Sequence, residues 1–349
     1  MIFYFLGILA FIFVLGVVIF PVETDSLRSS IGISKDPSTK FLHGHKIVAS
    51  KQKYQASLFY SSKPLENYDE SIRRVHERIS TQEIDAADYG HSIIMTHGHK
   101  TEKVIVFYHG YTNCPRQFED LGKKFFEQGY NVYVPRVPHH GINDLFTKEI
   151  GRLTIRELMQ VCDESVDIAR GLGKKVTVLG ISMGGVMAAW NAQFREDLDK
   201  AVLVVPSFGW YFLPGIIKPL VNVSFLFPNS FLWWDPVKRE KRRSPFSMYH
   251  RFSTHGMGHI LRLGLSVFRA SKKQAPLSKN IYVMTNDMDI AVDEPNIKKV
   301  AENWKRFGAN VAWYRFSKEL KMEHDIVDPL HPYARVDFVY EKILEKIAG

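Results

Sequence analysis

One serine stands in a setting that could make it a nucleophile. In VTVLGISMGGVMAAW, residues 176–190, β-prone residues lead into Gly180, and helix formers follow Ser182 and Gly184. The G-x-S-x-G spacing between a strand and a helix is typical of a nucleophile elbow, a turn so tight that side chains at the flanking positions would clash. Such a serine attacks a carbonyl carbon, and the first N–H groups of the helix favour the negative charge that develops. The alternative interpretation is a purely structural glycine turn.

A serine hydroxyl is a weak nucleophile until a base removes its proton. His324 follows the predicted strand NVAWYRF (310–316) after a short loop, and His331 lies seven residues further on. We expect His324 to be the base because it is nearer the strand end. The segment NIYVMTNDMDIAVD, which follows the serine and precedes the histidine, supplies three carboxylates that could orient the base: Asp287, Asp289 and Asp293.

Two backbone donors are needed to bind the oxyanion of the intermediate. The N–H of Met183, directly after the serine, is the first expected donor. The second should come from the loop after the strand KVIVFYHG, which contains His109, Gly110 and Tyr111. A glycine there permits close approach of the backbone, so the N–H of Tyr111 is the expected second donor.

These residues must be positioned by a regular alternation of strands and helices. Such an alternation predicts a mostly parallel, doubly wound α/β sheet covered on both faces. The predicted strands are 46–60, 91–96, 103–110, 131–137, 174–180, 200–208, 280–286 and 310–316, and the predicted helices are 67–86, 117–130, 154–173 with a glycine cap, 183–194, 294–308 and a last one in 332–348.

Composition restricts the class of protein. The chain has 349 residues, 45% of them hydrophobic, and a formal net charge of +9. No zinc-finger spacing or heptad basic region is present, so we expect no nucleic-acid partner. The two cysteines, Cys114 and Cys162, lie in predicted helices and form no disulfide framework. The His-Gly-His triplets at 43–45 and 97–99 lack acidic or cysteine partners at ligand spacing, so we expect no metal and no cofactor.

The N-terminus predicts a membrane anchor. Residues 2–22 carry no charge, and ~1.5 Å per residue gives about 30 Å of helix, enough to cross a bilayer core. A signal peptide is the alternative, but the basic n-region and a small-residue cleavage site are missing. Basic residues follow this segment and none precedes it, which favours a cytoplasmic catalytic domain. The expected organisation is an anchor at 1–22, a linker at 23–45 and one domain at 46–349.

An aromatic-rich insertion interrupts the alternation at about 210–275. It contains WWDP at 233–236 and the basic run KREKRR at 238–243, followed by an amphipathic stretch from 260 to 268. It lies between the predicted strands 200–208 and 280–286, where the fold family that the chain resembles, described next, commonly inserts a cap over the active site, so the resemblance implies a helical cap here. An apolar cap favours an apolar acyl group, and it could also face a membrane. For Trp233 and Trp234, simple core packing is an equal interpretation, and the basic run is typical of a solvated face.

The chain resembles the α/β-hydrolases of the esterase, lipase and monoacylglycerol-lipase-like group. The matching segments lie within residues 90–345: HGYTNCPRQF (109–118), VPRVPHHG (134–141), GISMGG (180–185), NDMDIAV (286–292) and HD (324–325). The resemblance implies the α/β-hydrolase fold and a structural role for His140 and Gly141. It also implies Asp289 as the acid of the Ser182–His324–Asp289 triad, although Asn286 stands where that family usually has glycine.

The expected function is hydrolysis of carboxylic esters that have hydrophobic acyl groups, with lipid-like substrates at a membrane. The same triad could serve a thioesterase, an acyltransferase or a peptidase, although a basic, aromatic cap disfavours a peptidase that must bind a substrate amine. A non-catalytic, membrane-tethered lipid-binding scaffold is the alternative outside enzymes. The sequence does not predict the oligomeric state.

Overall fold

The computed structural model describes residues 62–211, 221, 224–234 and 248–348. The predicted anchor at 2–22, the linker at 23–45, the strand at 46–60 and the basic run at 238–243 lie outside the described residues. Within the described ranges, no helix is both long and apolar enough to cross a bilayer.

Seven strands form one sheet in the described part of the chain, in the order β1-β3-β2-β4-β5-β8-β9. Only β1 is antiparallel to its neighbour; every other pair is parallel. The strands are β1 Ile93–Met95, β2 Thr101–Tyr108, β3 Tyr130–Val134, β4 Gly173–Ile181, β5 Lys200–Val204, β8 Asn280–Asn286 and β9 Asn310–Phe316. The central residues of β2, β3, β4, β5 and β8 are mostly buried apolar side chains, as a sheet covered on both faces requires, whereas the edge strands β1 and β9 are largely half-buried.

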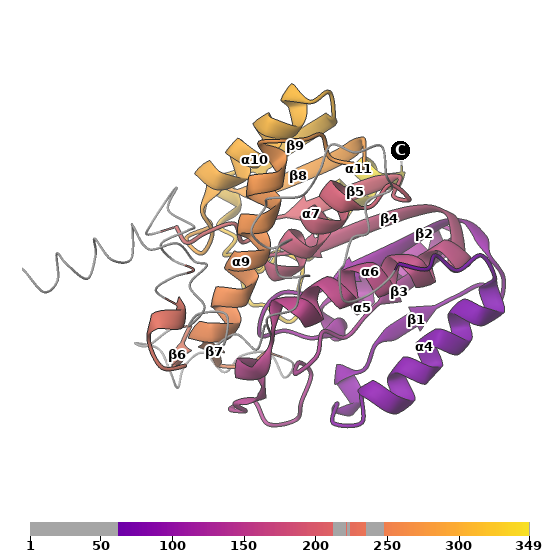
Figure 1. The fold of residues 1–349 in the computed structure, drawn as a ribbon, viewed down its shortest axis with the longest axis horizontal. Helices are drawn as coiled ribbons and strands as arrows, with labels where there is room; N and C mark the ends of the chain where they lie inside the picture. The colour runs from indigo at the N-terminus through magenta and orange to yellow at the C-terminus, as the bar shows by residue number, and fades with distance from the viewer. Residues whose placement is uncertain (1–61, 212–220, 222–223, 235–247, 349) are drawn as a thin grey trace, which may run out of the picture.

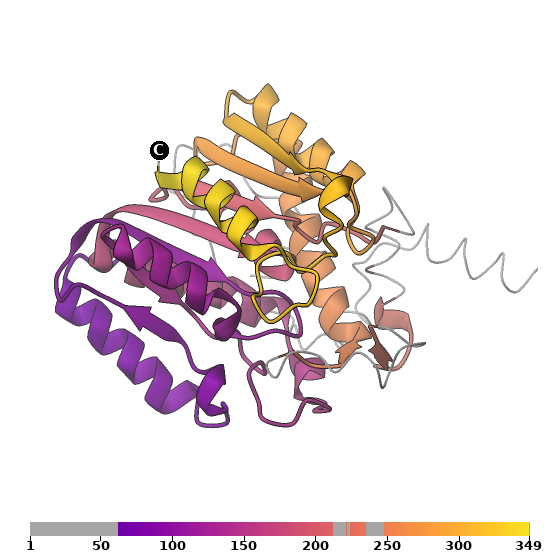
Figure 2. The same cartoon turned by 180° about the vertical axis from the view of Figure 1, so that it is seen from behind.

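Helices cover both faces of the sheet (Figures 1 and 2). One face carries α6, α7, α9 and α10, with α4 packed beside α6, and the other carries α5 and α11. Their bounds are α4 Tyr68–Gln82, α5 Glu119–Glu127, α6 Ile155–Leu172, α7 Met183–Phe194, α9 Thr254–Ser271, α10 Glu294–Arg306 and α11 Val336–Ala348. Four short 3₁₀ turns lie at Asp88–Gly90, Pro115–Phe118, Glu149–Arg152 and Lys318–Leu320 in the described ranges.

The predicted insertion at 210–275 is divided by the structure. Its last part forms α9, which packs against α6, α7 and α10 in the helical layer. The reason is the apolar face of α9, because Ile260, Leu261, Leu263 and Val267 are fully buried. In the described residues, the part that lies outside this layer includes a small hairpin of β6 (Phe231–Trp233) and β7 (Arg251–Ser253).

Two local expectations also differ from the structure. Gly173 is extended, with φ −154°, and begins β4 directly after α6. An added Cβ would lie 2.7 Å from Cβ of Val104, so close packing, not a left-handed helix cap, requires this glycine. Cys114 precedes the 3₁₀ turn that begins at Pro115 and does not lie in a helix, whereas Cys162 lies in α6. Both cysteines are buried, and neither forms a disulfide among the described residues.

Candidate active site

Ser182 is the single residue between β4 and α7, and its backbone is strained. Its φ of 56° and ψ of −113° lie in a region that L-residues rarely adopt. A Cβ on Gly180 would lie 2.0 Å from the carbonyl oxygen of Gly184, and one on Gly184 would lie 1.9 Å from that of Tyr108. Both flanking glycines are therefore required by the turn that presents the serine.

The backbone of Ser182 is anchored to the end of the neighbouring strand. Its N–H donates to the carbonyl of Val204 at 3.0 Å, and its carbonyl accepts from the N–H of Ser207 at 3.1 Å. The residue is half-buried. This anchoring fixes the serine at the carboxyl edge of the sheet, where β4, β5, β8 and β9 all end because they are parallel.

His324 and Asp289 form a hydrogen-bonded pair at the same edge. Nδ1 of His324 donates to Oδ2 of Asp289 at 2.6 Å. The other carboxylate oxygen of Asp289 accepts from the N–H groups of Ala291 at 2.8 Å and Val292 at 3.3 Å. Both oxygens of the carboxylate are thus held in place. Because Nδ1 of His324 carries the proton that it donates to Asp289, Nε2 is the basic nitrogen of the ring. Among the described hydrogen bonds, none joins His324 to Ser182; catalytic contacts of this kind are often long without substrate.

The other two aspartates that the sequence offered have different partners. Asp287 pairs with Arg315 at 3.3 Å. Asp293 is the N-cap of α10 and accepts from the N–H of Asn296 at 3.2 Å. His331 lies 3.7 Å from a carboxylate oxygen of Glu323. The structure therefore brings together one acid and one histidine of the candidates, Asp289 and His324.

The charge of Asp289 controls the protonation of His324. Burial lowers the pKa of His324, but the charge of Asp289 and its hydrogen bond, together with the charge of Asp325, outweigh burial and raise the pKa above 6.5. The imidazole is thereby a stronger base than a free histidine, which suits proton removal from a hydroxyl.

The predicted oxyanion loop is rigidly held. His109 is fully buried, and burial lowers its pKa to about 4, so its ring is neutral. Its Nε2 accepts from the N–H of Val137 at 3.2 Å, which places the proton on Nδ1 and lets it donate to the carbonyl of Gly110 at 3.0 Å. A Cβ on Gly110 would meet its nearest atom at an ordinary 3.6 Å, so the fold itself does not require this glycine.

The two expected oxyanion donors come from two different segments, the start of α7 and the loop after β2. Met183 is the first residue of α7, where N–H groups have no partner within a helix. Tyr111 is buried, and its hydroxyl donates to the carbonyl of Ser253 and accepts from the N–H of Ser253, both at 3.3 Å. Its phenol therefore joins the loop to the end of β7.

Part of the predicted cap rests on this loop. Nε1 of Trp234 donates to Oγ1 of Thr112 at 3.0 Å, and the N–H of Tyr249 donates to the carbonyl of Thr112 at 2.7 Å. Trp233 stacks edge-on against Phe146. The two tryptophans therefore differ: Trp234 contacts the oxyanion loop, while Trp233 packs against Phe146 and His250.

Several residues that hold the site were not foreseen. Asn286 donates from Nδ2 to the carbonyls of Met322 and Glu323, at 2.9 and 2.8 Å, so it braces the loop before His324. The side-chain amide of Gln117 joins Gly110 of the oxyanion loop to Asp325, the residue after His324. The signals were present in the sequence, since Asn286 replaces an expected glycine and Asp325 follows the histidine, but their partners are distant in the chain.

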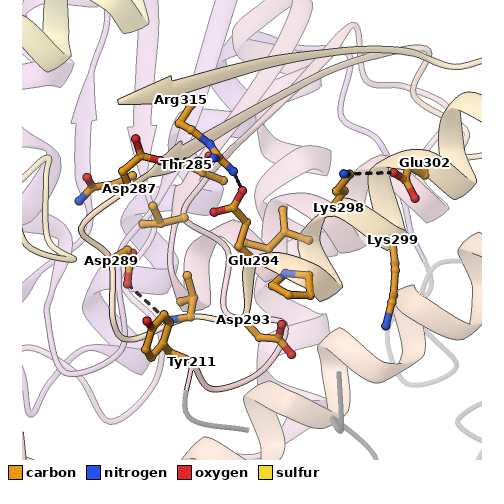
Figure 3. A pocket seen from close by; sticks show the side chains of 15 residues that line it. Tyr211, Thr285, Asp287, Asp289, Asp293, Glu294, Lys298, Lys299, Glu302 and Arg315 are labelled. Carbon is orange, nitrogen blue, oxygen red and sulfur yellow. Dashed lines mark hydrogen bonds and ion pairs between the residues drawn. The ribbon is translucent and has the colours of Figure 1, made fainter. Parts of the chain in front are cut away.

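A cavity of about 950 Å³ lies beside the loop after β8 that carries Asp289 (Figure 3). Asp287, Glu294 and Arg315 cluster on one side of it, and Lys299 projects from α10. Asp289 is part of its wall, whereas Ser182 and His324 are not among its lining residues. Among the described residues, no group of three or more His, Cys, Asp or Glu side chains could hold a metal ion.

Two kinds of comparison identify relatives of this chain. The model of the family described as serine aminopeptidase, S33, matches residues 99–253, a stretch that contains Ser182 and ends before Asp289 and His324. No curated protein matches the chain in sequence.

Solved structures share the fold at low sequence identity. One comes from work on LipS and LipT, two metagenome-derived lipolytic enzymes. It is 15% identical, covers 75% of this chain and 99% of its own, and superposes with a TM-score of 0.56. The monoacylglycerol lipase of Paleococcus ferrophilus is 18% identical, covers 73% and 98%, and has a TM-score of 0.54. With the parallel sheet and its serine elbow, these likenesses show that the chain has the α/β-hydrolase fold.

Proposed function

We propose that this protein hydrolyses carboxylic esters with hydrophobic acyl groups through Ser182, His324 and Asp289. The observation that carries the proposal is the 2.6 Å pair of His324 and Asp289 at the sheet edge where the strained elbow presents Ser182. Lipolytic activity in the structural relatives supports an ester substrate.

The chemistry takes two balanced steps. Oγ of Ser182 attacks the ester carbonyl while Nε2 of His324 accepts its proton; the tetrahedral intermediate then collapses, and the imidazolium gives that proton to the departing alcohol. Water next adds to the acyl-enzyme, with His324 again as base, and releases the carboxylic acid and free Ser182. Asp289 keeps the Nδ1–H tautomer and stabilises the imidazolium. The N–H groups of Met183 and Tyr111 bind the oxyanion, each worth roughly 3 kcal/mol in such sites.

The surroundings of the site support an apolar, lipid-like substrate. Large apolar side chains are exposed on the described part of the cap, among them Leu226, Phe227 and Leu232. An uncharged segment at 2–22 would hold the enzyme at a bilayer, with the catalytic domain on the cytoplasmic side. Together they favour a monoacylglycerol or lysophospholipid over a short, soluble ester.

Labelling with a fluorophosphonate tests the activated serine. The full-length protein in detergent should react, and Ser182→Ala should abolish the reaction. Ser207→Ala is a matched control, because Ser207 contacts Ser182 only through its backbone N–H in the described hydrogen bonds. Folded wild-type protein that remains unlabelled would refute the proposal.

A second set of measurements tests the substrate and the anchor. Long-chain monoacyl esters in micelles should be hydrolysed faster than short soluble esters, and the reverse preference would refute the lipid proposal. Full-length protein should remain with membranes after alkaline extraction, whereas a chain that begins at residue 23 should not. An N-terminus found near residue 23 in the mature protein would instead indicate a cleaved signal peptide.

Peptide hydrolysis is the second candidate, because the matching family is described as serine aminopeptidase. A site for a substrate amine would need a carboxylate in the cap. The described cap residues, 210–211, 221, 224–234 and 248–253, contain no Asp or Glu, whereas Arg251 is basic. Release of an N-terminal residue from peptides at a rate above ester hydrolysis would reverse this order.

A further inference from the structure

The peptide bond between Gly110 and Tyr111 decides where the N–H of Tyr111 points. In a trans peptide, the carbonyl and the following N–H point in opposite directions. The carbonyl of Gly110 accepts from Nδ1 of His109 at 3.0 Å and from the N–H of Asn113 at 3.2 Å. These two hydrogen bonds fix the peptide plane and therefore the direction of the Tyr111 donor.

The other side of Gly110 is joined to the loop that carries His324. The N–H of Gly110 donates to Oε1 of Gln117 at 2.8 Å, and Nε2 of Gln117 donates to Oδ2 of Asp325 at 2.8 Å. The amide of Gln117 can lie only this way round, because a flipped amide would set its NH₂ against the N–H of Gly110. The chain of two hydrogen bonds ends one residue after His324.

Asp325 is itself held as an acceptor. Its Oδ1 accepts from the N–H of Asp328 at 3.2 Å, and Asn113 donates to Oδ2 of Asp325 at 3.3 Å and of Asp328 at 2.9 Å. The side chains of this group belong to residues that are at most 8% exposed. Buried hydrogen bonds of this kind fix geometry because leaving any group unpaired is costly.

We propose that Gln117 and Asp325 are positioning residues, which form a relay that fixes the oxyanion loop (109–114) against the loop of His324. The relay keeps the N–H of Tyr111 and the imidazole directed at one substrate carbonyl. The inference rests on the proposed function, since it assigns the relay to ester hydrolysis through Ser182. It acts on the transition state more than on substrate binding, so its loss lowers kcat more than it raises KM.

An exchange of the two side chains tests the relay. Gln117→Glu sets two carboxylates against each other. In Asp325→Asn, the new amide cannot accept from both Gln117 and the N–H of Asp328 through its one oxygen. The double variant restores the chain from Gly110 to Asp328 in the opposite direction, while Asn113 loses its longer hydrogen bond to position 325 and keeps the one to Asp328. The new carboxylate at position 117 accepts from the N–H of Gly110 and from the new amide at position 325, and the oxygen of that amide accepts from the N–H of Asp328. The buried charge of the pair is unchanged.

Each single variant should lower kcat for a soluble ester about 10- to 100-fold, with KM changed less than about threefold, and the double variant should recover most of the loss. Gln193→Glu is the matched control. Gln193 is a buried glutamine that donates to the carbonyl of Ala275 at 3.0 Å and accepts from Trp304 at 2.7 Å, in the helical layer. It should lose stability but keep the kcat of the folded enzyme.

Amide hydrogen exchange in residues 109–118 gives a readout that does not depend on activity. Exchange should rise in both single variants and return towards the wild-type rate in the double variant. If the single variants match Gln193→Glu in kcat and leave this exchange unchanged, the relay is refuted, while ester hydrolysis that depends on Ser182 still supports the proposed function. If the wild type hydrolyses no ester, the proposed function fails, and the exchange pattern alone supports or refutes the relay.

Discussion

The side-chain amide of Asn286 donates to the carbonyl of Glu323 at 2.8 Å, and Glu323 directly precedes His324. A second hydrogen bond from the same amide reaches the carbonyl of Met322 at 2.9 Å. Asn286 is also the last residue of β8, three positions before Asp289. One strand end therefore positions both Asp289 and the loop that presents His324.

Replacing Asn286 with alanine should loosen that loop. Three side-chain hydrogen bonds would be lost, the two donated to Met322 and Glu323 and one accepted from the N–H of Met288. At about 1 kcal/mol each, we expect a loss of roughly 3 kcal/mol in unfolding free energy. We also expect kcat to fall about 10-fold, because a small misplacement of the base is costly. Urea unfolding and ester kinetics measure the two effects.

Asn280→Ala is the control for this variant. Asn280 begins the same strand, is exposed, and donates one hydrogen bond to the carbonyl of Asp199 at 3.2 Å. It should leave kcat unchanged and alter stability by less than about 0.5 kcal/mol. Equal kcat in the two variants would show that Asn286 does not position His324.

Asp289→Asn should nearly abolish turnover while the protein stays folded. The new amide can set an NH₂ against Nδ1 of His324 and favour the wrong tautomer, a change that lowers kcat about 10⁴-fold in a comparable triad. Asp287→Asn is the matched control, because Asp287 pairs with Arg315 at the protein surface. Steady-state kinetics of both variants measure the loss of kcat, and a larger loss in Asp287→Asn would identify Asp287 as the acid.

Local steric and periodic patterns account for what the sequence could predict. Alternating strands and helices predicted the parallel sheet, since short apolar runs rich in β-branched and aromatic residues, such as 104–108, favour buried strands. The elbow was predictable because a collision of Gly180 with Gly184 involves residues four apart in sequence. The arrangement of the insertion at 210–275 was not predictable from the sequence. An amphipathic α9 could belong to a cap or to the layer that covers the sheet, and only its packing partners distinguish the two.

Contacts between distant segments account for the rest. Gln117 and Asp325 are 208 positions apart, and no local pattern marks a polar side chain as the partner of another at that separation. The choice among Asp287, Asp289 and Asp293 likewise depended on which carboxylate faces His324. The resemblance to known hydrolases indicated Asp289, whereas the residues alone left all three open.

The elbow glycines should tolerate no side chain. In Gly184→Ala the new Cβ would overlap the carbonyl oxygen of Tyr108, which lies 1.9 Å from its ideal position. We expect a loss of about 3 kcal/mol or more, the upper range for overpacking. Gly110→Ala is the control, since its Cβ would meet only ordinary contacts at 3.6 Å, and it should change the unfolding free energy by less than about 0.5 kcal/mol. Similar losses in both variants would contradict the steric explanation.

Activity and stability should respond to pH in opposite directions at His324 and Asp325. The pKa of His324 is raised above 6.5, and burial, together with the charge of Asp328, raises the pKa of Asp325 from 3.8 to about 7. For both groups the folded state binds protons more tightly than the unfolded state. Their contribution to stability is therefore complete below the unfolded pKa and is lost as pH rises through the folded pKa. Catalysis instead needs neutral His324, so the rate rises over the same range.

The difference between wild type and Asp325→Asn isolates this effect from other groups. Buried His109 and His259 have lowered pKa values, of about 4 and about 3, and therefore act in the opposite sense, with stability lost as pH falls below 6.5. Because these histidines titrate in both proteins, their contributions cancel in the difference. Between pH 5 and 8 the wild type should lose stability relative to Asp325→Asn, as measured by urea unfolding at each pH. The acid limb of kcat/KM should also move to lower pH in the variant, because the charge of Asp325 helps to raise the pKa of His324. A difference in stability that does not change with pH would show that Asp325 stays ionised throughout this range.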